Sequence, residues 1–182
     1  MAQSSPRLMR LESDFYSLSG LRDSSDFIDF TASGSPPDRY VLRFTCRGLT
    51  WDSARNEPVE SEDHKVQLDL HSEYPRRPPY VQMLTPIFHP NMLSPERGGG
   101  VCFNATIWSP QEKLNDFVLR LGHMIQYKNY WAEPTGPRFL DSAAASWARQ
   151  NVDRLPIDSR DLIRDSSFVK VVTDEDVEIR IL

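Results

Sequence analysis

The sequence predicts an α+β fold: an N-terminal helix, an antiparallel four-stranded meander, an irregular segment suited to an active site, C-terminal helices and a C-terminal β-hairpin extension. Three observations predict it. Apolar residues recur at helical spacing near the N-terminus and again after residue 109. Between these stretches, short runs alternate apolar and polar residues, as strands do. A segment rich in proline and glycine separates the last run from the second helical pattern.

The first predicted element is an amphipathic helix over residues 5–19. The apolar residues at helical spacing are Leu8, Leu11, Phe15 and Leu18. The charged residues off this stripe are Arg7, Arg10, Glu12 and Asp14. Gly20 is placed to end the helix. The stripe indicates a helix packed on a sheet.

Four short strands are predicted next, at residues 27–31, 40–46, 66–70 and 80–84. In the second strand, Cys46 shares a face with Leu42 and Phe44, so we expect a buried and inert thiol. The short turns between consecutive strands favour an antiparallel meander.

Residues 85–108 show little periodicity, and long irregular segments inside compact domains often carry function. Ser109, Pro110 and Glu112 then form a capping box with proline at the first helical position, which predicts a helix start. The apolar residues that follow at helical spacing are Leu114, Phe117, Val118, Leu121 and Ile125. A further helix is predicted from about 139 to 150, with a buried face of Leu140, Ala143, Ala144 and Trp147.

We predict one domain over residues 1–150 and an acidic extension over 151–182, which carries 5 − 8 = −3 of the net charge of −5. Residues 168–172 and 177–181 flank an acidic turn and predict a β-hairpin. Because a lone hairpin is marginal in water, we expect it to dock on the domain or on a second copy of the chain.

The composition argues against several classes of function. The acidic balance and the lack of a basic run make nucleic acid an unexpected partner. Apolar stretches of membrane-spanning or signal-peptide length are missing, so we expect no membrane contact and a cytoplasmic location. The two cysteines give no disulfide framework, and the four scattered histidines lack the spacing of a zinc site, so no metal is expected.

Four motifs follow one another within residues 74–110. They are Tyr74-Pro75 with Pro78-Pro79, then His89-Pro90-Asn91, then Cys102 after Gly100-Val101, and finally Trp108-Ser109-Pro110. This order resembles the ubiquitin-conjugating enzyme family, and the resemblance covers roughly residues 5–150. It implies that family's fold and a conjugating activity.

The resemblance implies that Cys102 is the catalytic nucleophile, which carries a ubiquitin-like modifier as a thioester. A carrier thiolate needs exposure and room more than a dedicated base, and the glycines at 98–100 would let a partner's backbone come close. The alternative is a small buried cysteine after a turn. Asn91 is implied to stabilise the oxyanion that forms when an amine attacks, or to order the loop near Cys102. A plain turn asparagine after a proline is the other interpretation.

The resemblance also implies supporting and partner-binding residues. His89, Pro90 and Trp108 would have packing roles, and Glu133 would help an incoming lysine. Residues implied to bind partners are Arg7 and Arg10 for the activating enzyme, and Arg76 and Pro110 for a ligase. Arg76 stands where relatives often show an exposed aromatic, so the need for a ligase stays open. For the two arginines of the first helix, a solvated helix face is the alternative.

The sequence departs from the family pattern on both sides of the cysteine. Asn91 and Cys102 are eleven positions apart, with an insertion at 94–100, whereas only six positions separate Cys102 from Trp108. The predicted hairpin stands where many relatives carry a fourth helix. These departures resemble a divergent prokaryotic-type member with a minimal conjugation pathway.

The predicted function is therefore a ubiquitin-like protein conjugating enzyme. It would accept the modifier from an activating enzyme and pass it to an amine of a target protein, without a cofactor, since the activating enzyme consumes the ATP. One alternative is a non-catalytic module of this fold, although such modules usually lack the cysteine. A cysteine hydrolase is the other alternative, but it would need a histidine and an orienting acid near Cys102, and no such trio stands out.

Overall fold

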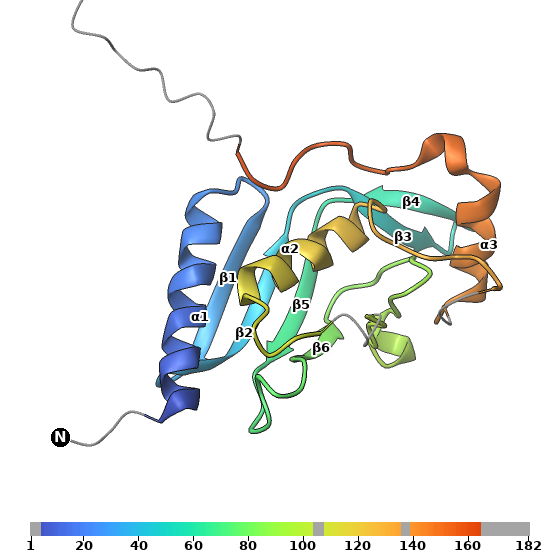
Figure 1. The fold of residues 1–182 in the computed structure, drawn as a ribbon. Helices are drawn as coiled ribbons and strands as arrows, with labels where there is room; N and C mark the ends of the chain where they lie inside the picture. Colours follow the sequence, from blue (N-terminus) through green and yellow to red (C-terminus); the bar gives the residue numbers. More distant parts are fainter. Residues whose placement is uncertain (1–4, 104–107, 136–138, 165–182) are drawn as a thin grey trace, which may run out of the picture.

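The structure is a computed structural model that describes residues 5–103, 108–135 and 139–164 (Figure 1). It confirms the predicted α+β fold. Helix α1 (Pro6–Asp23) precedes the sheet, and α2 (Leu114–Ile125) and α3 (Ser142–Gln150) follow it. Among the described residues, no helix is both long and apolar enough to cross a membrane. The predicted hairpin within residues 168–181 lies outside the described residues.

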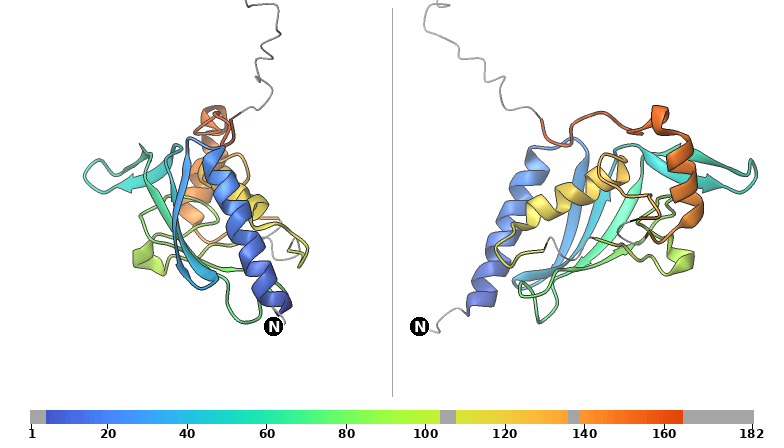
Figure 2. Two further views of the ribbon diagram at one scale, coloured as in Figure 1. Left: turned by 90° about the vertical axis from the view of Figure 1, so that its left-hand side faces the viewer. Right: turned by 45° about the vertical axis from the view of Figure 1, so that its right-hand side comes forward.

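The central sheet has four strands in the order β1-β2-β5-β6, and each neighbouring pair is antiparallel. Its strands are β1 (Ile28–Gly34), β2 (Pro37–Phe44), β5 (His64–Asp69) and β6 (Tyr80–Met83). In the register, Leu42 of β2 lies between Phe30 and Val66, and all three side chains are buried. Helices α1 and α2 cover the same face of this sheet (Figure 2). The predicted meander is therefore confirmed.

Between β2 and β5 the chain forms a hairpin that the sequence does not predict. Strands β3 (Gly48–Asp52) and β4 (Glu57–Ser61) make a separate two-stranded sheet, which projects from the body (Figure 2). Strand β4 contains a proline and two glutamates, which are uncommon in strands, so its sequence favours a loop. Pro58 is tolerated because it pairs with Trp51 in a sheet where both strands are edges.

Helix α1 does not end at Gly20, as the sequence predicts, but continues to Asp23. A glycine costs a helix about 1 kcal/mol, and the burial of Leu21 offsets that cost. The amide of Ser24 caps the helix by donating to the carbonyl of Gly20 at 3.1 Å. Asp14, which the helical pattern assigns to the solvent side, is buried.

The predicted starts of both later helices are wrong. Ser109 does not cap α2, because the peptide groups of residues 109–112 form a turn in which the Glu112 amide donates to the Ser109 carbonyl at 2.9 Å. The Glu112 carboxylate pairs with Arg120 instead of reaching back to Ser109. Helix α3 begins after Asp141, whose side chain accepts from the amide of Ala144.

The buried face of α3 also differs from the prediction. Its buried residues are Ala144, Ala145 and Ala148, whereas Ala143 is exposed and Leu140 and Trp147 are half-buried. Small side chains let this helix approach closely, and its cluster includes Leu49 of β3, Phe88 and Tyr127. The larger core lies between the sheet and the helices α1 and α2, where Cys46 is buried as expected.

Residues 151–164 cross the molecule from α3 to the start of β1 (Figure 1). Leu162 is buried in the main core, and its carbonyl accepts from the Ser25 hydroxyl at 2.5 Å. The Asp158 carboxylate is also buried, where it binds the backbone amide of Arg47 at 2.8 Å. The packed body thus extends to at least Arg164, past the predicted boundary at residue 150.

Candidate functional site

The His89-Pro90-Asn91 segment is fully buried and bonds to three distant parts of the chain. Its first residue, His89, accepts from the backbone amide of Asn91 at its Nδ1, 3.0 Å away. The His89 ring packs edge-on against Tyr127, with ring centroids 4.6 Å apart. Burial lowers the pKa of His89 to about 3, so the ring is neutral at physiological pH. A neutral, enclosed imidazole fits the packing role that the sequence predicts.

Pro90 and Asn91 make the longer connections. The Pro90 carbonyl accepts from the amides of Leu140 and Asp141, at 2.7 and 3.0 Å, and so holds the approach to α3. The Asn91 side chain bonds the backbone of Trp131 twice: Nδ2 donates to its carbonyl and Oδ1 accepts from its amide, each at 3.0 Å. The Asn91 carbonyl accepts from the amide of Cys102 at 2.8 Å. Asn91 therefore ties the cysteine to the segment around Trp131.

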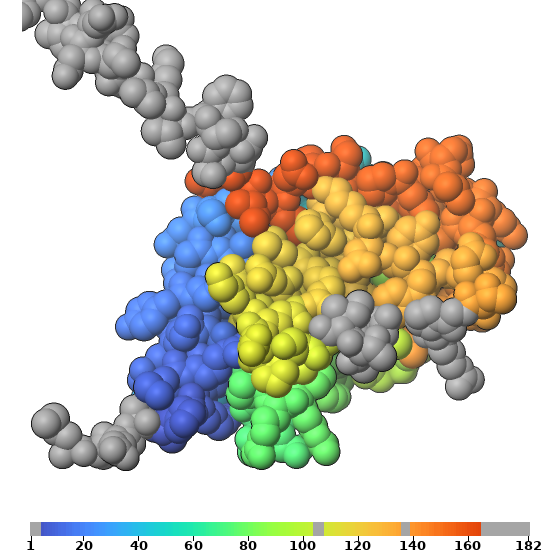
Figure 3. Space-filling model, viewed as in Figure 1, coloured from blue at the N-terminus to red at the C-terminus, as the bar shows by residue number. Residues whose placement is uncertain are grey.

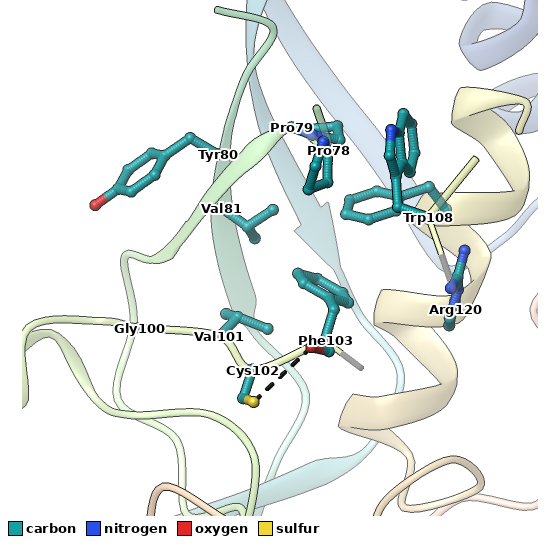
Figure 4. A pocket seen from close by; sticks show the side chains of 11 residues that line it. Pro78, Pro79, Tyr80, Val81, Gly100, Val101, Cys102, Phe103, Trp108 and Arg120 are labelled. Atoms are coloured by element: carbon teal, nitrogen blue, oxygen red, sulfur yellow. Dashed lines mark hydrogen bonds between the residues drawn. The ribbon is translucent and has the colours of Figure 1, made fainter. Parts of the chain in front are cut away.

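Cys102 lies at the wall of a pocket of about 350 Å³ between β6 and α2 (Figure 4). The described residues that line it are Pro78, Pro79, Tyr80, Val81, Gly100, Val101, Cys102, Phe103, Trp108, Phe117 and Arg120. The thiol is partly buried, with its Sγ 3.9 Å from the carbonyl oxygen of Phe103. Burial raises the pKa of Cys102 above its ordinary value. The resting side chain is thus a partly exposed thiol.

Cys46 is a natural comparison for this thiol. Its side chain is fully buried, and burial raises its pKa to about 12. Cys46 is buried, whereas Cys102 is only partly buried. This partial exposure fits a reactive thiol better than an enclosed structural cysteine.

The insertion before Cys102 folds against the sheet instead of standing open. Ser94 accepts from the Ile87 amide and donates to the Ile87 carbonyl, at 2.9 and 2.8 Å. A short 3₁₀ turn, Pro95–Arg97, follows, and Arg97 pairs with Asp141 at the start of α3. At its end, the Gly99 carbonyl accepts from the Met83 amide of β6 at 2.8 Å, so the insertion is bonded to both the sheet and the start of α3.

The glycine run has a structural cause. Gly98 and Gly99 adopt positive φ values of 94° and 66°. A Cβ on Gly99 would lie 2.7 Å from the Met83 carbonyl oxygen, so glycine is required for the close approach to β6. Gly100 alone of the three has open space and an ordinary φ. Close approach by a partner, which the sequence suggests for the run, therefore fits Gly100 and not Gly99.

Trp108 and Glu133 differ in their surroundings. The Trp108 indole donates to the Pro75 carbonyl at 2.9 Å and packs against Tyr74 and Phe117, so its packing role is direct. Glu133 is exposed, two residues after the Trp131 backbone that Asn91 holds. Sequence reasoning misses Trp131, because a partner forty positions away leaves no local pattern.

The four predicted partner-binding residues differ in accessibility. Arg76 and Pro110 are exposed. Arg7 donates to the carbonyl oxygen of Leu70 at 2.7 Å and lies 4.0 Å from Asp38. The Arg10 guanidinium bonds within the chain, to Asp14 among others, so it is not a freely solvated charge. Its spacing of four residues from Asp14 is the sequence signal for that pair.

The described residues around Cys102 offer neither a histidine nor a carboxylate as a lining group of the pocket. Three histidines use ring nitrogens for hydrogen bonds to the backbone instead. His64 bonds to Ser61, His71 to Pro78, and His89 to Asn91. In the part of the chain that the structure describes, no three side chains of the metal-binding types come together. A Cys-His hydrolase site is therefore not assembled among these residues.

Comparisons with known proteins agree on one family. The family model described as ubiquitin-conjugating enzyme matches residues 49–151, more than half of the chain. The chain is 30% identical to ubiquitin-conjugating enzyme E2 1 of Caenorhabditis elegans over 125 residues, covering 65% of this chain and 57% of that protein. It is 27% identical to ubiquitin-conjugating enzyme E2 13 of Saccharomyces cerevisiae over 103 residues, covering 56% and 62%. The chain thus spans less than two thirds of the length of these relatives.

Solved structures show the same fold. The E2 domain of a Toxoplasma gondii ubiquitin-conjugating enzyme matches with a TM-score of 0.55 and 20% identity, over 80% of this chain and 88% of that one. A structure described as a novel ubiquitin-conjugating enzyme matches with a TM-score of 0.57 and 20% identity, over 80% and 86%.

Proposed function

This chain belongs to the ubiquitin-conjugating enzyme family, and from that premise we propose that it carries a ubiquitin-like modifier as a thioester on Cys102. The modifier would come from an activating enzyme and pass to an amine, such as a lysine of a target protein. The enzyme needs no cofactor of its own, because ATP is consumed by the activating enzyme. A reducing cytoplasm suits a carrier that depends on a free thiol.

The placement of Cys102 is the observation that carries the proposal. Its amide is bonded to the Asn91 carbonyl of the His89-Pro90-Asn91 segment, while the residue lines a pocket and its side chain stays partly exposed. The backbone is thus anchored at Cys102 and the side chain is partly accessible. A carrier nucleophile requires both properties, since the partner must bring its carbonyl to a sulfur that does not move away.

The reaction would proceed in two exchanges at one carbonyl carbon. In the first, the Cys102 thiolate attacks the modifier's thioester on the activating enzyme, a new C–S bond forms, and the activating enzyme's thiolate leaves. In the second, an amine attacks, a C–N bond forms, the bond to Cys102 breaks, and the amine loses a proton as the thiol is restored. Because burial raises the pKa of Cys102, charging should accelerate as pH rises through the neutral range.

For Asn91 the contacts support the loop-ordering role over that of oxyanion donor. Both ends of its side-chain amide are bonded to the Trp131 backbone, and the side chain is fully buried. Glu133 is exposed on the segment that Asn91 holds, a suitable place for a carboxylate that orients an incoming ammonium group. Its proposed role is therefore to orient the lysine, with Asn91 fixing the loop.

Two exposed residues, Arg76 and Pro110, are the candidates for a ligase-facing surface. The Arg7 side chain keeps a third of its surface exposed at the start of α1, and so remains a candidate contact for the activating enzyme. Charge reversal at Arg7 or Arg76 would test the corresponding contact, and so would substitution of Pro110.

The deciding experiment is a charging assay with ubiquitin, a ubiquitin-activating enzyme and ATP. Wild-type protein should form an adduct that a thiol reductant removes, and Cys102→Ala should form none. Cys102→Ser should give a reductant-resistant ester, because an oxygen ester is less reactive. Cys46→Ala is the matched control and should still be charged. An adduct that persists in Cys102→Ala would overturn the assignment.

The alternative is a module of this fold that binds ubiquitin-like proteins without carrying them. Its expected behaviour is ubiquitin binding by the wild type that survives Cys102→Ala unchanged, with no adduct under any condition. The accessible thiol at Cys102 argues against it.

A further inference from the structure

Arg10 lies in a buried cluster on the inner side of α1. Its Nε donates to both carboxylate oxygens of Asp14, at 3.0 and 2.9 Å, and its Nη2 donates to the Tyr74 hydroxyl at 2.8 Å. The Tyr74 hydroxyl in turn donates to Asp14 at 2.6 Å. Asp14 and Tyr74 are buried, and the Arg10 side chain is 19% exposed. The guanidinium is therefore fixed in orientation.

From this position Arg10 binds the loop that follows the cysteine segment. Its Nη1 donates to the Pro110 carbonyl and its Nη2 to the Glu112 carbonyl, each at 2.6 Å. The space-filling view shows α1, the turn at 71–79 and the loop at 108–113 meeting on one face (Figure 3). Without these bonds, the two carbonyl groups would have no partner from α1, and the loop would lose its fastening to that helix.

Both ends of the 108–113 loop reach the pocket that Cys102 lines. At one end, Trp108 lines the pocket and packs on Phe117, whose ring is 4.7 Å from the Phe103 ring next to the cysteine. At the other end, the Glu112 carboxylate pairs with Arg120, the charged side chain among the described lining residues. The position of this loop therefore shapes one wall of the pocket that Cys102 lines.

We propose that Arg10 is a positioning residue for the chemistry of Cys102, because it fastens the 108–113 loop that forms one wall of the cysteine's pocket. The inference rests on the proposed thioester function. It assigns Arg10 a role inside the domain, in place of a docking charge for the activating enzyme. In this role Arg10 makes no bond to substrate.

The chemistry of the side chain makes the proposal testable. A guanidinium presents several donors in a planar fork and here reaches a carboxylate, a hydroxyl and two carbonyl groups. A lysine keeps the positive charge but presents a single nitrogen, so it cannot bridge all of them. Arg10→Lys thus separates positioning, which it impairs, from charge-based docking, which it preserves.

The first measurement is alkylation of Cys102 by iodoacetamide as a function of pH, followed by peptide mapping. In Arg10→Lys the loosened loop should expose the thiol and lower its apparent pKa, which burial raises in the wild type. A shift of about half a pH unit corresponds to roughly a threefold faster reaction below the pKa. Arg22→Lys is the control, since Arg22 lies on the same helix but pairs with the exposed Asp23. Its profile should match the wild type.

The second measurement is discharge of a preformed ubiquitin thioester to free lysine, with the activating enzyme removed. Arg10→Lys should discharge about tenfold more slowly, a loss typical of misplacement near a reacting group. Tyr74→Phe, which removes the hydroxyl that joins Arg10 to Asp14, should slow discharge to a smaller extent. This second variant keeps the test available if Arg10→Lys folds poorly.

The outcomes decide between three roles. A shifted alkylation profile with slower discharge supports positioning. Slower charging with unchanged discharge and alkylation would assign Arg10 to docking and overturn the proposal. A lower melting temperature with both rates unchanged would leave Arg10 a structural brace and also overturn it. If the wild type forms no thioester, the proposed function fails, and the alkylation profile alone decides whether Arg10 sets the environment of Cys102.

Discussion

Replacing Asn91 by alanine tests whether this residue holds the site together or acts on the reaction. The variant loses two hydrogen bonds to the Trp131 backbone, each 3.0 Å long and made by a fully buried side chain. Each bond contributes about 1 kcal/mol, and leaving the partner groups short of a bond adds about 1 kcal/mol more. We expect the free energy of unfolding to fall by about 3 kcal/mol.

A domain of this size loses roughly 2–4 °C of melting temperature per kcal/mol, so the midpoint should drop by about 10 °C. Urea unfolding gives the free energy. Thioester charging and discharge to lysine should fall together, because the backbone at residue 91, which loses its side-chain bonds to Trp131, carries the carbonyl that accepts from the Cys102 amide. Asn151→Ala is the matched control: it removes a side-chain bond to the Trp147 carbonyl at the end of α3 and a long, exposed bond from Arg154, and it should cost about 1 kcal/mol.

The opposite result would refute this reasoning. If Asn91→Ala unfolds like the wild type but discharges to lysine about a hundredfold more slowly, the amide acts as an oxyanion donor during the reaction. In that case the bonds to Trp131 would have to exchange for bonds to the reacting carbonyl.

Three further predictions concern stability. In the folded protein the pKa of His89 is about 3, below its ordinary 6.5, so the unfolded state binds the proton first as pH falls. The free energy of unfolding should therefore decrease below pH 6.5, by up to about 1.4 kcal/mol per pH unit. Urea unfolding of His89→Asn at each pH should show this contribution removed. Burial alone would raise the pKa of Asp158, but hydrogen bonds from Arg160 hold it below the ordinary 3.8. Asp158→Asn should therefore cost about 2 kcal/mol at neutral pH, with the difference from the wild type shrinking as pH falls below 3.8; an unchanged difference in acid would contradict this. Gly99→Ala should lose about 2 kcal/mol or more in chemical denaturation, from its φ of 66° and the contact with β6, whereas Gly100→Ala, with open space, should stay within about 0.5 kcal/mol of the wild type.

Features with a local period could be predicted from the sequence. The stripe of α2 and the alternation in β5 each bury one face, and burying that face is what holds the element in place. The β3–β4 hairpin could not be predicted in this way, because Pro58 and the charges of β4 contradict strand propensity. Its stability comes from Leu49 and the cluster under α3, which are contacts that the local sequence does not record.

The same distinction applies to the site. The order of short motifs around Cys102 was enough to predict the family and the candidate nucleophile, because those residues are close in the sequence. The contacts of Asn91 with Trp131 and of Arg10 with Pro110 join residues 40 and 100 positions apart. Such bonds exist only after the sheet and helices have packed, since packing alone brings their backbone carbonyl groups within reach.

The sequence by itself therefore determined the helices and sheet with clear periodicity and pointed to Cys102 as the candidate nucleophile. The tertiary structure decided where the helices begin. At α2, Arg10 binds two carbonyl groups of the predicted cap and Glu112 pairs with Arg120, so the helix starts at Leu114. At α3, the Pro90 carbonyl accepts hydrogen bonds from the amides of Leu140 and Asp141, and the helix starts at Ser142. A capping motif predicts the hydrogen bonds that a helix start can make locally, but hydrogen bonds to residues elsewhere in the fold, such as Arg10 and Pro90, set the boundary.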